Sequence, residues 1–181
     1  KAIDICEGDM VLTRDNGYQP VRWAGATHLS AKDLLDHPEK RPVRIAAKAL
    51  DGVHPTRPML LSPQHWVLLS GAQAELLFGE AEVLAAAVHL TGQTGVRQVL
   101  PDQGVTYVHF MFDQHELVMS DGAWTESFQP GEMTLAGLGA EQRDEIFGLF
   151  PELATQAGRT AYVAARSELK AHQAVVFLKA S

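Results

Sequence analysis

Short apolar stretches alternate with turn-forming residues along most of this chain. The clearest is GVTYVHFMF, at residues 104–112, where successive side chains would alternate between the two faces of a strand. Near the N-terminus, Asn16-Gly17 separates two apolar-rich runs, and this dipeptide readily takes the positive φ angles of a tight hairpin turn. Many short strands with turns between them predict a mainly β domain. Further strands are expected at residues 41–50, 59–62, 66–70, 74–78, 115–119 and 172–180.

Helical spacing is confined to two segments. Residues 30–37 form a candidate helix that has Ser30 as its N-cap and a proline just past its end. In residues 139–153, apolar residues recur at helical spacing, acidic residues crowd the first turns, and Pro151 marks the end. Residues 154–161 are expected to form a loop. The pattern therefore predicts a mainly β fold with a short helix added towards the C-terminus.

The composition is that of an ordinary globular protein. The 181 residues are 46% apolar and 20% charged, which allows a sizeable core and is unlike a disordered chain. No linker, low-complexity run or fixed-period repeat interrupts the sequence. We therefore expect residues 1–181 to form a single domain.

Charge and hydropathy argue against several kinds of partner. The formal net charge of −7 repels a phosphate backbone and no basic stripe offsets it, so nucleic acid is not expected as a partner. No apolar run approaches the roughly 20 residues that span a bilayer, and no signal-peptide pattern is present, so no membrane partner is expected. The glycine-rich phosphate-binding motifs and the H-E-x-x-H zinc motif are missing, and no cofactor is expected.

The apolar segment LLSPQHWVLL, residues 60–69, is interrupted by Ser62 and His65. Pro63 suits the second position of a β-turn, which would bring the Ser62 hydroxyl and the His65 ring to the same side. Histidine titrates near neutral pH, so a ring held beside a hydroxyl is a candidate acid–base pair. The structural alternative is that Ser62 caps the turn while His65 is a partly buried ring with one satisfied nitrogen.

The segment VHFMFDQHELV, residues 108–118, holds a second candidate group. Asp113 precedes His115 by two residues and could orient its ring or share its proton, as a carboxylate does for a catalytic imidazole. The structural alternative is a polar turn between two strands. In a metal alternative, His65, His109 and His115 converge as zinc ligands, although no sequence spacing supports this set.

Cys6 is the single cysteine and the obvious candidate nucleophile. It stands directly before a turn and has no nearby histidine to activate it. We therefore expect Cys6 to be a small buried hydrophobic residue rather than a reactive thiol.

Five sequence blocks, taken in order, carry a family resemblance. They are EGDMVLTRDNGYQPVRWAG, RPVRIAAKAL, LLSPQHWVLLSGAQAELLFGEAEVLAAAVHL, VTYVHFMFDQHELVMSDGAWTESFQPG and the closing HQAVVFLKA. This series resembles the Hint domain, the Hedgehog/intein autoprocessing family, in its bacterial form. The match runs from about Ile3 to the closing segment. The resemblance implies a compact, mainly β, horseshoe-like fold with pseudo-two-fold symmetry.

The resemblance also implies an activity. Hint domains rearrange the peptide bond at their own N-terminal boundary, where a cysteine or serine side chain attacks the preceding carbonyl and forms a thioester or ester. Ser62 and His65 match the family's [ST]-x-x-H motif, with His65 protonating the departing amide nitrogen and Ser62 helping to hold the strained peptide. Asp113 and His115 match a later block that assists the rearrangement. Protonation and nearby donors are what a poor leaving group and a developing oxyanion require.

Two departures from the family pattern bear on this activity. The family's nucleophile lies upstream of the GDMVLT block, so we expect the nucleophile strand to be missing from residues 1–181 and assign Cys6 no such role. The sequence lacks the His-Asn ending of splicing inteins, so cleavage rather than splicing is expected. The expected partner is the flanking polypeptide of the same precursor, and the resemblance implies export within a larger bacterial protein. The alternatives are a catalytically silent binding or structural module with this fold, and a metal-dependent hydrolase.

Overall fold

The computed structural model describes residues 2–180, and it describes the side chains of all of these except residues 132, 133 and 180. The chain divides into two units, each with its own packed core. Unit 1 consists of residues 1–27, 108–118 and 127–165, and unit 2 consists of residues 28–107, 119–126 and 166–181. The expectation of a single domain over residues 1–181 stays a prediction.

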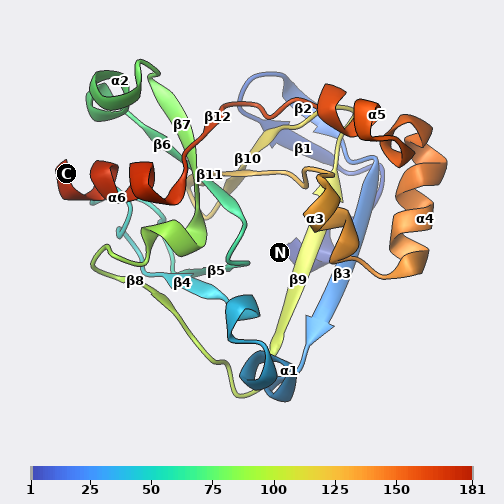
Figure 1. Cartoon of the computed structure of the whole chain (residues 1–181), viewed down its shortest axis with the longest axis horizontal. Helices are drawn as coiled ribbons and strands as arrows, with labels where there is room; N and C mark the ends of the chain where they lie inside the picture. Colours follow the sequence, from blue (N-terminus) through green and yellow to red (C-terminus); the bar gives the residue numbers. More distant parts are fainter. Residues whose placement is uncertain (1, 181) are drawn as a thin grey trace. The chain divides into compact units, whose positions relative to one another are not determined.

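Unit 2 is built on two β-sheets with short helices between the strands (Figure 1). Its strands are β4 (Val43–Ile45), β5 (Met59–Leu61), β6 (Trp66–Ser70), β7 (Glu82–Ala86), β8 (Val96–Gln98), β11 (Ala123–Glu126) and β12 (Ser167–Glu168). Its helices are α1 (Ala31–Asp36), η2 (Pro38–Lys40), α2 (Ala72–Phe78), η3 (Ala87–Leu90) and α6 (Ala171–Ala180). Four strands of unit 2 belong to a seven-stranded sheet and lie in it in the order β12-β7-β6-β11, and the second sheet, antiparallel throughout, has the order β5-β4-β8.

Alternation along the strands of unit 2 builds its core. Val43 and Ile45 are buried while Arg44 between them is not, and Met59 and Leu61 are buried around the exposed Leu60. Strand β7 is buried along Val83–Ala86, as expected of a strand covered on both faces.

Unit 1 combines a hairpin with a helical segment. The hairpin joins β1 (Met10–Thr13) to β2 (Gly17–Pro20), and β1 also pairs with β10 (Leu117–Ser120) through Thr13 and Val118. Strands β3 (Trp23–Leu29), β9 (Val105–Met111) and β10 carry the chain from one unit into the other. The remaining elements are η1 (Ala2–Asp4), α3 (Glu132–Ala136), α4 (Ala140–Leu149), η4 (Pro151–Ala154) and α5 (Gln156–Ala161).

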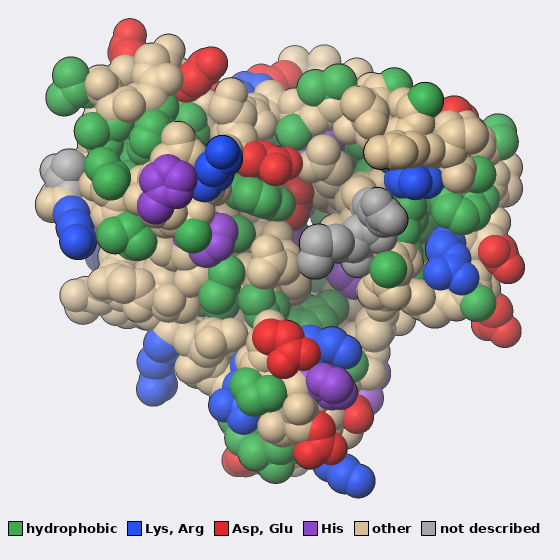
Figure 2. Space-filling view, viewed as in Figure 1, with side chains coloured by type: hydrophobic (Ala, Val, Ile, Leu, Met, Phe, Trp, Pro, Cys, Tyr) green, Lys and Arg blue, Asp and Glu red, His purple; other side chains and the backbone are tan. Residues whose placement is uncertain are grey.

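Several predictions from the hydrophobic pattern are confirmed. The fold is mainly β, and the predicted N-terminal hairpin forms: it turns through residues 14–16, and Gly17 opens β2 at φ 66°. The C-terminal helix predicted over residues 139–153 is α4. Helix α1 begins at the predicted cap, where the Ser30 side chain accepts the Asp33 N–H at 3.2 Å and the Asp33 carboxylate accepts the Ser30 N–H at 2.8 Å. On the surface around α1, Figure 2 shows Lys and Arg side chains interspersed with Asp and Glu side chains.

Three predictions of local structure are wrong. Residues 74–78 lie in helix α2 instead of a strand, because Gly71 opens a new element and Gly79 closes it in the left-handed conformation, φ 73°. Residues 172–180 lie in helix α6, which packs against α2, η3 and β7 (Figure 1). Residues 154–161 are largely helical, in η4 and α5, where Thr155 caps α5 by accepting the Gly158 N–H.

Residue 104 has to be a glycine, because two backbone segments of unit 2 come close together there. Gly104 has φ +74°, and a Cβ built there would lie 2.2 Å from the carbonyl oxygen of Leu29. We expect Gly104→Ala to lower the free energy of unfolding by about 2–3 kcal/mol, from combined strain and steric clash. Gly17→Ala is the matched control, because Gly17 has φ +66° but open space around its Cβ position. Urea unfolding should show the smaller loss for Gly17→Ala, and equal losses would contradict the close approach.

Candidate active site

The sequence SPQH forms the turn between β5 and β6 in unit 2. The N–H of His65 donates to the carbonyl oxygen of Ser62 at 3.0 Å, which closes the predicted β-turn with Pro63 in its second position. Ser62 and His65 are both partly buried, and the side chain of Gln64 between them is exposed. The structure therefore brings the two predicted residues together at one tight turn.

Helix η3 holds this turn in place from one side. The N–H of Ala87 donates to the carbonyl oxygen of His65 at 2.9 Å, and the N–H of Val88 donates to that of Pro63 at 2.9 Å. Backbone bonds of this kind fix the course of the chain whatever side chains the turn carries. The histidine is thus carried by a segment with a defined backbone.

A buried carboxylate that the sequence analysis did not identify holds the turn from another side. Glu126, at the end of β11, is 8% exposed, and its Oε1 accepts the N–H of Trp66 at 3.0 Å. Trp66 directly follows His65, so Glu126 fixes the residue that leads out of the motif. Strand β11 reaches this position by pairing with β6 through Thr125 and Val67.

Asp113 and His115 lie in unit 1, after the end of β9. Asp113 is exposed and forms an ion pair with Arg22, at 3.5 Å between carboxylate and guanidinium. His115 is only 4% exposed, and its Nδ1 accepts the N–H of Ala165 at 2.9 Å. A neutral ring that accepts through Nδ1 carries its proton on Nε2, so His115 is set up as a donor through that nitrogen. A backbone amide, rather than Asp113, gives this ring its orientation.

Glu116 is a second buried acid that the sequence analysis did not identify. It is 2% exposed, and its Oε1 accepts hydrogen bonds from Asn16 at 2.9 Å and from Gln114 at 3.0 Å. Its backbone N–H donates to the Ser127 hydroxyl at 3.0 Å, and its carbonyl accepts the Ser127 N–H at 2.8 Å. These bonds satisfy a carboxylate that would otherwise be costly to bury.

Tyr162 also lies in unit 1, and its hydroxyl donates a hydrogen bond to the carbonyl oxygen of Phe112 at 3.1 Å. Burial raises the pKa of Tyr162, and the carboxylates of Glu116 and Asp113 raise it further. The hydroxyl therefore remains protonated and remains a donor at neutral pH.

His109 is a packed ring in unit 1. It meets Phe128 edge-on at 5.3 Å between ring centroids, and burial lowers its pKa. The folded state therefore binds a proton at His109 less readily than the unfolded state does. Stability from this residue is present above the unfolded pKa, near 6.5, and is lost as the pH falls below it.

A pH titration of stability tests the state of His109. We expect the wild-type free energy of unfolding to fall between about pH 6.5 and pH 5, since unfolding exposes a ring that takes up a proton there. His109→Phe should show a shallower fall over the same range, measured by urea unfolding at each pH. An unchanged slope in this variant would show that His109 titrates alike in both states.

The thiol of Cys6 is exposed, so the expectation of a buried cysteine is wrong. The backbone N–H of Cys6 donates to the Asp9 carboxylate at 2.9 Å, which makes residues 6–9 a surface turn with no apolar cover for the side chain. Its sulfur lies 3.7 Å from the carbonyl oxygen of Asp4.

The zinc alternative finds no ligand set in the described part of the chain. Within residues 2–180, no group of three or more His, Cys, Asp or Glu side chains is arranged to hold a metal ion. His65 belongs to unit 2, while His109 and His115 belong to unit 1. Over the same residues, none of the helices has the length and apolar character that crossing a membrane requires.

Comparison with known proteins gives one family match. Residues 3–132 match the family model described as the Hint domain. No curated protein and no solved structure gives a significant match to the chain.

Proposed function

Since the chain belongs to the Hint domain family, we propose that it is an autoprocessing domain that cleaves the peptide bond at its own N-terminal boundary. The substrate is the flanking polypeptide of the same precursor, and each molecule turns over once. The attacking group is the cysteine or serine side chain at that junction. Cys6 is assigned no part in the reaction.

The proposed step is an N-to-S or N-to-O acyl shift. The junction thiol or hydroxyl attacks the carbonyl carbon of the preceding residue, the carbon–nitrogen bond breaks, and a thioester or ester forms in its place. The amide nitrogen takes up a proton as it leaves, and the thiol or hydroxyl gives one up. Water or an added thiol then attacks the ester carbonyl, which releases the upstream segment and restores the side chain.

The observation that carries this proposal is the fixed turn at Ser62 and His65. An amide nitrogen leaves only if an acid stands within hydrogen-bond reach, and a positioned histidine supplies that proton near neutral pH. The bonds from η3 and from Glu126 support a histidine whose backbone is held on both sides. His65 is assigned the role of general acid, and Ser62 that of holding the strained peptide.

Asp113 and His115 are assigned the assisting role that the family gives to their block. The Nε2 proton that the hydrogen bond from Ala165 leaves on His115 supports a donor role for this ring towards the developing oxyanion. Asp113 is assigned an assisting role as well, and its exposed carboxylate forms an ion pair with Arg22 at 3.5 Å.

The test is intact-mass analysis of a precursor that carries the native upstream segment, incubated with and without an added thiol. Thiol-dependent release of a fragment ending at the junction is the expected result. A precursor that remains whole over several days would instead assign the chain to the alternative function, a silent binding or structural module with the same fold.

A further inference from the structure

The outward face of the three-stranded sheet in unit 2 carries two arginines side by side. Val43 and Ile45 in β4 are buried, so the side chain of Arg44 between them points out of the sheet. In the antiparallel pairing, Arg44 lies directly opposite Leu60 of β5 on one side and directly opposite Arg97 of β8 on the other. The three side chains therefore form one row across the outward face.

Neither guanidinium group has an acidic partner among the described side chains. Among the side chains that the structure describes, none forms an ion pair or hydrogen bond with Arg44 or Arg97. Like charges directly opposite each other in a sheet repel, and this repulsion destabilises the pairing. An anionic group between Arg44 and Arg97 would remove this repulsion and accept hydrogen bonds from both planar guanidinium groups.

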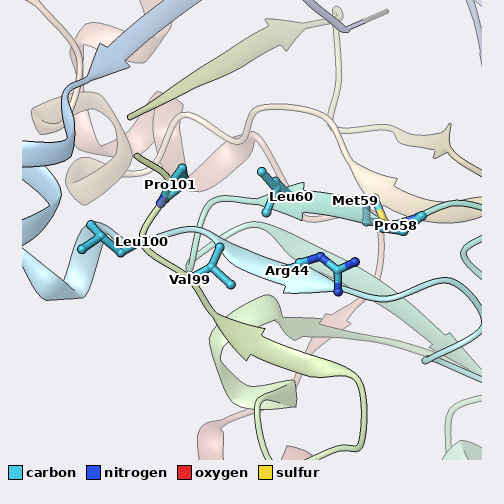
Figure 3. A pocket seen from close by; sticks show the side chains of 7 residues that line it. All are labelled: Arg44, Pro58, Met59, Leu60, Val99, Leu100 and Pro101. Atoms are coloured by element: carbon cyan, nitrogen blue, oxygen red, sulfur yellow. The ribbon is translucent and has the colours of Figure 1, made fainter. Parts of the chain in front are cut away.

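An apolar hollow of about 370 Å³ adjoins this row. Figure 3 shows that it is lined from β4, from β5 and from the segment that follows β8. Leu60 is 48% exposed and Leu100 is 40% exposed, so apolar surface stands open to water beside the positive charges. The lining residues are Arg44, Pro58, Met59, Leu60, Val99, Leu100 and Pro101.

We propose that this face of unit 2 is a docking surface for an extended polypeptide segment with an apolar residue two positions from an aspartate or glutamate. Side chains two positions apart in an extended chain lie on the same side, roughly 7 Å apart. The apolar side chain occupies the hollow while the carboxylate reaches the guanidinium groups of Arg44 and Arg97. The proposal does not depend on the cleavage activity.

Two features favour a polypeptide over other anions. The arginine pair and the apolar hollow adjoin each other on one face, so the ligand has to carry an apolar group beside its charge, as same-side residues of an extended chain do. Nucleic acid carries the right charge, but the net charge of −7 repels a long phosphate backbone. A short segment with one acidic and one apolar residue can bind both the two arginines and the apolar hollow.

Nuclear magnetic resonance titration of the whole ¹⁵N-labelled chain tests the proposal. The probe is the capped peptide acetyl-Thr-Leu-Thr-Glu-Thr-amide, and the matched control peptide has glutamine in place of glutamate. We expect saturable shifts at residues 44, 60 and 100 with the first peptide, and binding weaker by about tenfold or more with the second. Equal binding of the two peptides, or no shifts at these residues, would overturn the proposal.

Two double variants test whether binding depends on Arg44 and Arg97 themselves or only on the net charge of the chain. The double variant Arg44→Gln/Arg97→Gln should lose binding by about tenfold or more, and it should fold normally because it removes a repulsive pair. Lys32→Gln/Lys40→Gln removes the same charge from exposed positions elsewhere in unit 2 and should bind as wild type. Equal loss in both double variants would overturn the proposal, as would tighter binding of sodium octanoate or of a single-stranded oligonucleotide at this face.

Discussion

Replacing His65 with alanine is expected to slow cleavage of the precursor by a factor of about 10²–10⁴, the range over which a positioned general acid accelerates a reaction. The loss follows because the departing amide nitrogen would have to take its proton from water. The turn should survive, since its contacts with Ser62 and Ala87 use only backbone atoms of residue 65. Cleavage rates followed by mass, together with urea unfolding of each precursor, measure the two effects separately.

Two matched variants serve as controls for this result. Gln64→Ala changes an exposed side chain in the same turn, and Cys6→Ser changes the exposed thiol in unit 1. Both should cleave at the wild-type rate. Unchanged cleavage in His65→Ala would refute the role of His65, and loss of cleavage in Cys6→Ser would identify Cys6 as the attacking group.

The Ser62–His65 turn could be predicted from the sequence because its signal is local. A proline in the second position and polar residues between two apolar runs favour a β-turn in almost any surroundings. The two buried acids could not be predicted in this way. Glu116 and Glu126 resemble surface charges in the sequence, and their burial depends on donors far along the chain, such as Asn16 and the N–H of Trp66.

The same distinction applies to the fold. The hairpin at Asn16-Gly17 and helix α4 carry their own turn, charge and proline signals, and both are present. The apolar runs of α2 and α6 are short, and a short apolar run fits a buried strand as well as a buried helix. Which of the two forms depends on the surface against which the segment packs, and the periodicity of a short run does not contain that information.

The second large expected effect is a loss of stability on truncating a side chain of helix α6. Phe177→Ala is expected to lower the free energy of unfolding by about 3 kcal/mol, because it removes a large buried side chain and leaves a cavity. Phe177 is 9% exposed and stacks on Phe78 of α2 at 6.5 Å between ring centroids. Ala174, three residues earlier, is fully buried on the same face of the helix.

Val175→Ala distinguishes this helix from the strand that the sequence pattern predicts. In a strand, residues 175 and 177 would share a buried face, and truncating either would cost more than about 1 kcal/mol. In α6, Val175 is 44% exposed, so its truncation should cost less than about 1 kcal/mol. Urea unfolding of the two variants measures the difference. A loss above about 1 kcal/mol in both variants would mean that residues 172–180 follow the strand period, whereas a loss confined to Phe177→Ala requires the helical face on which residues 174 and 177 pack together.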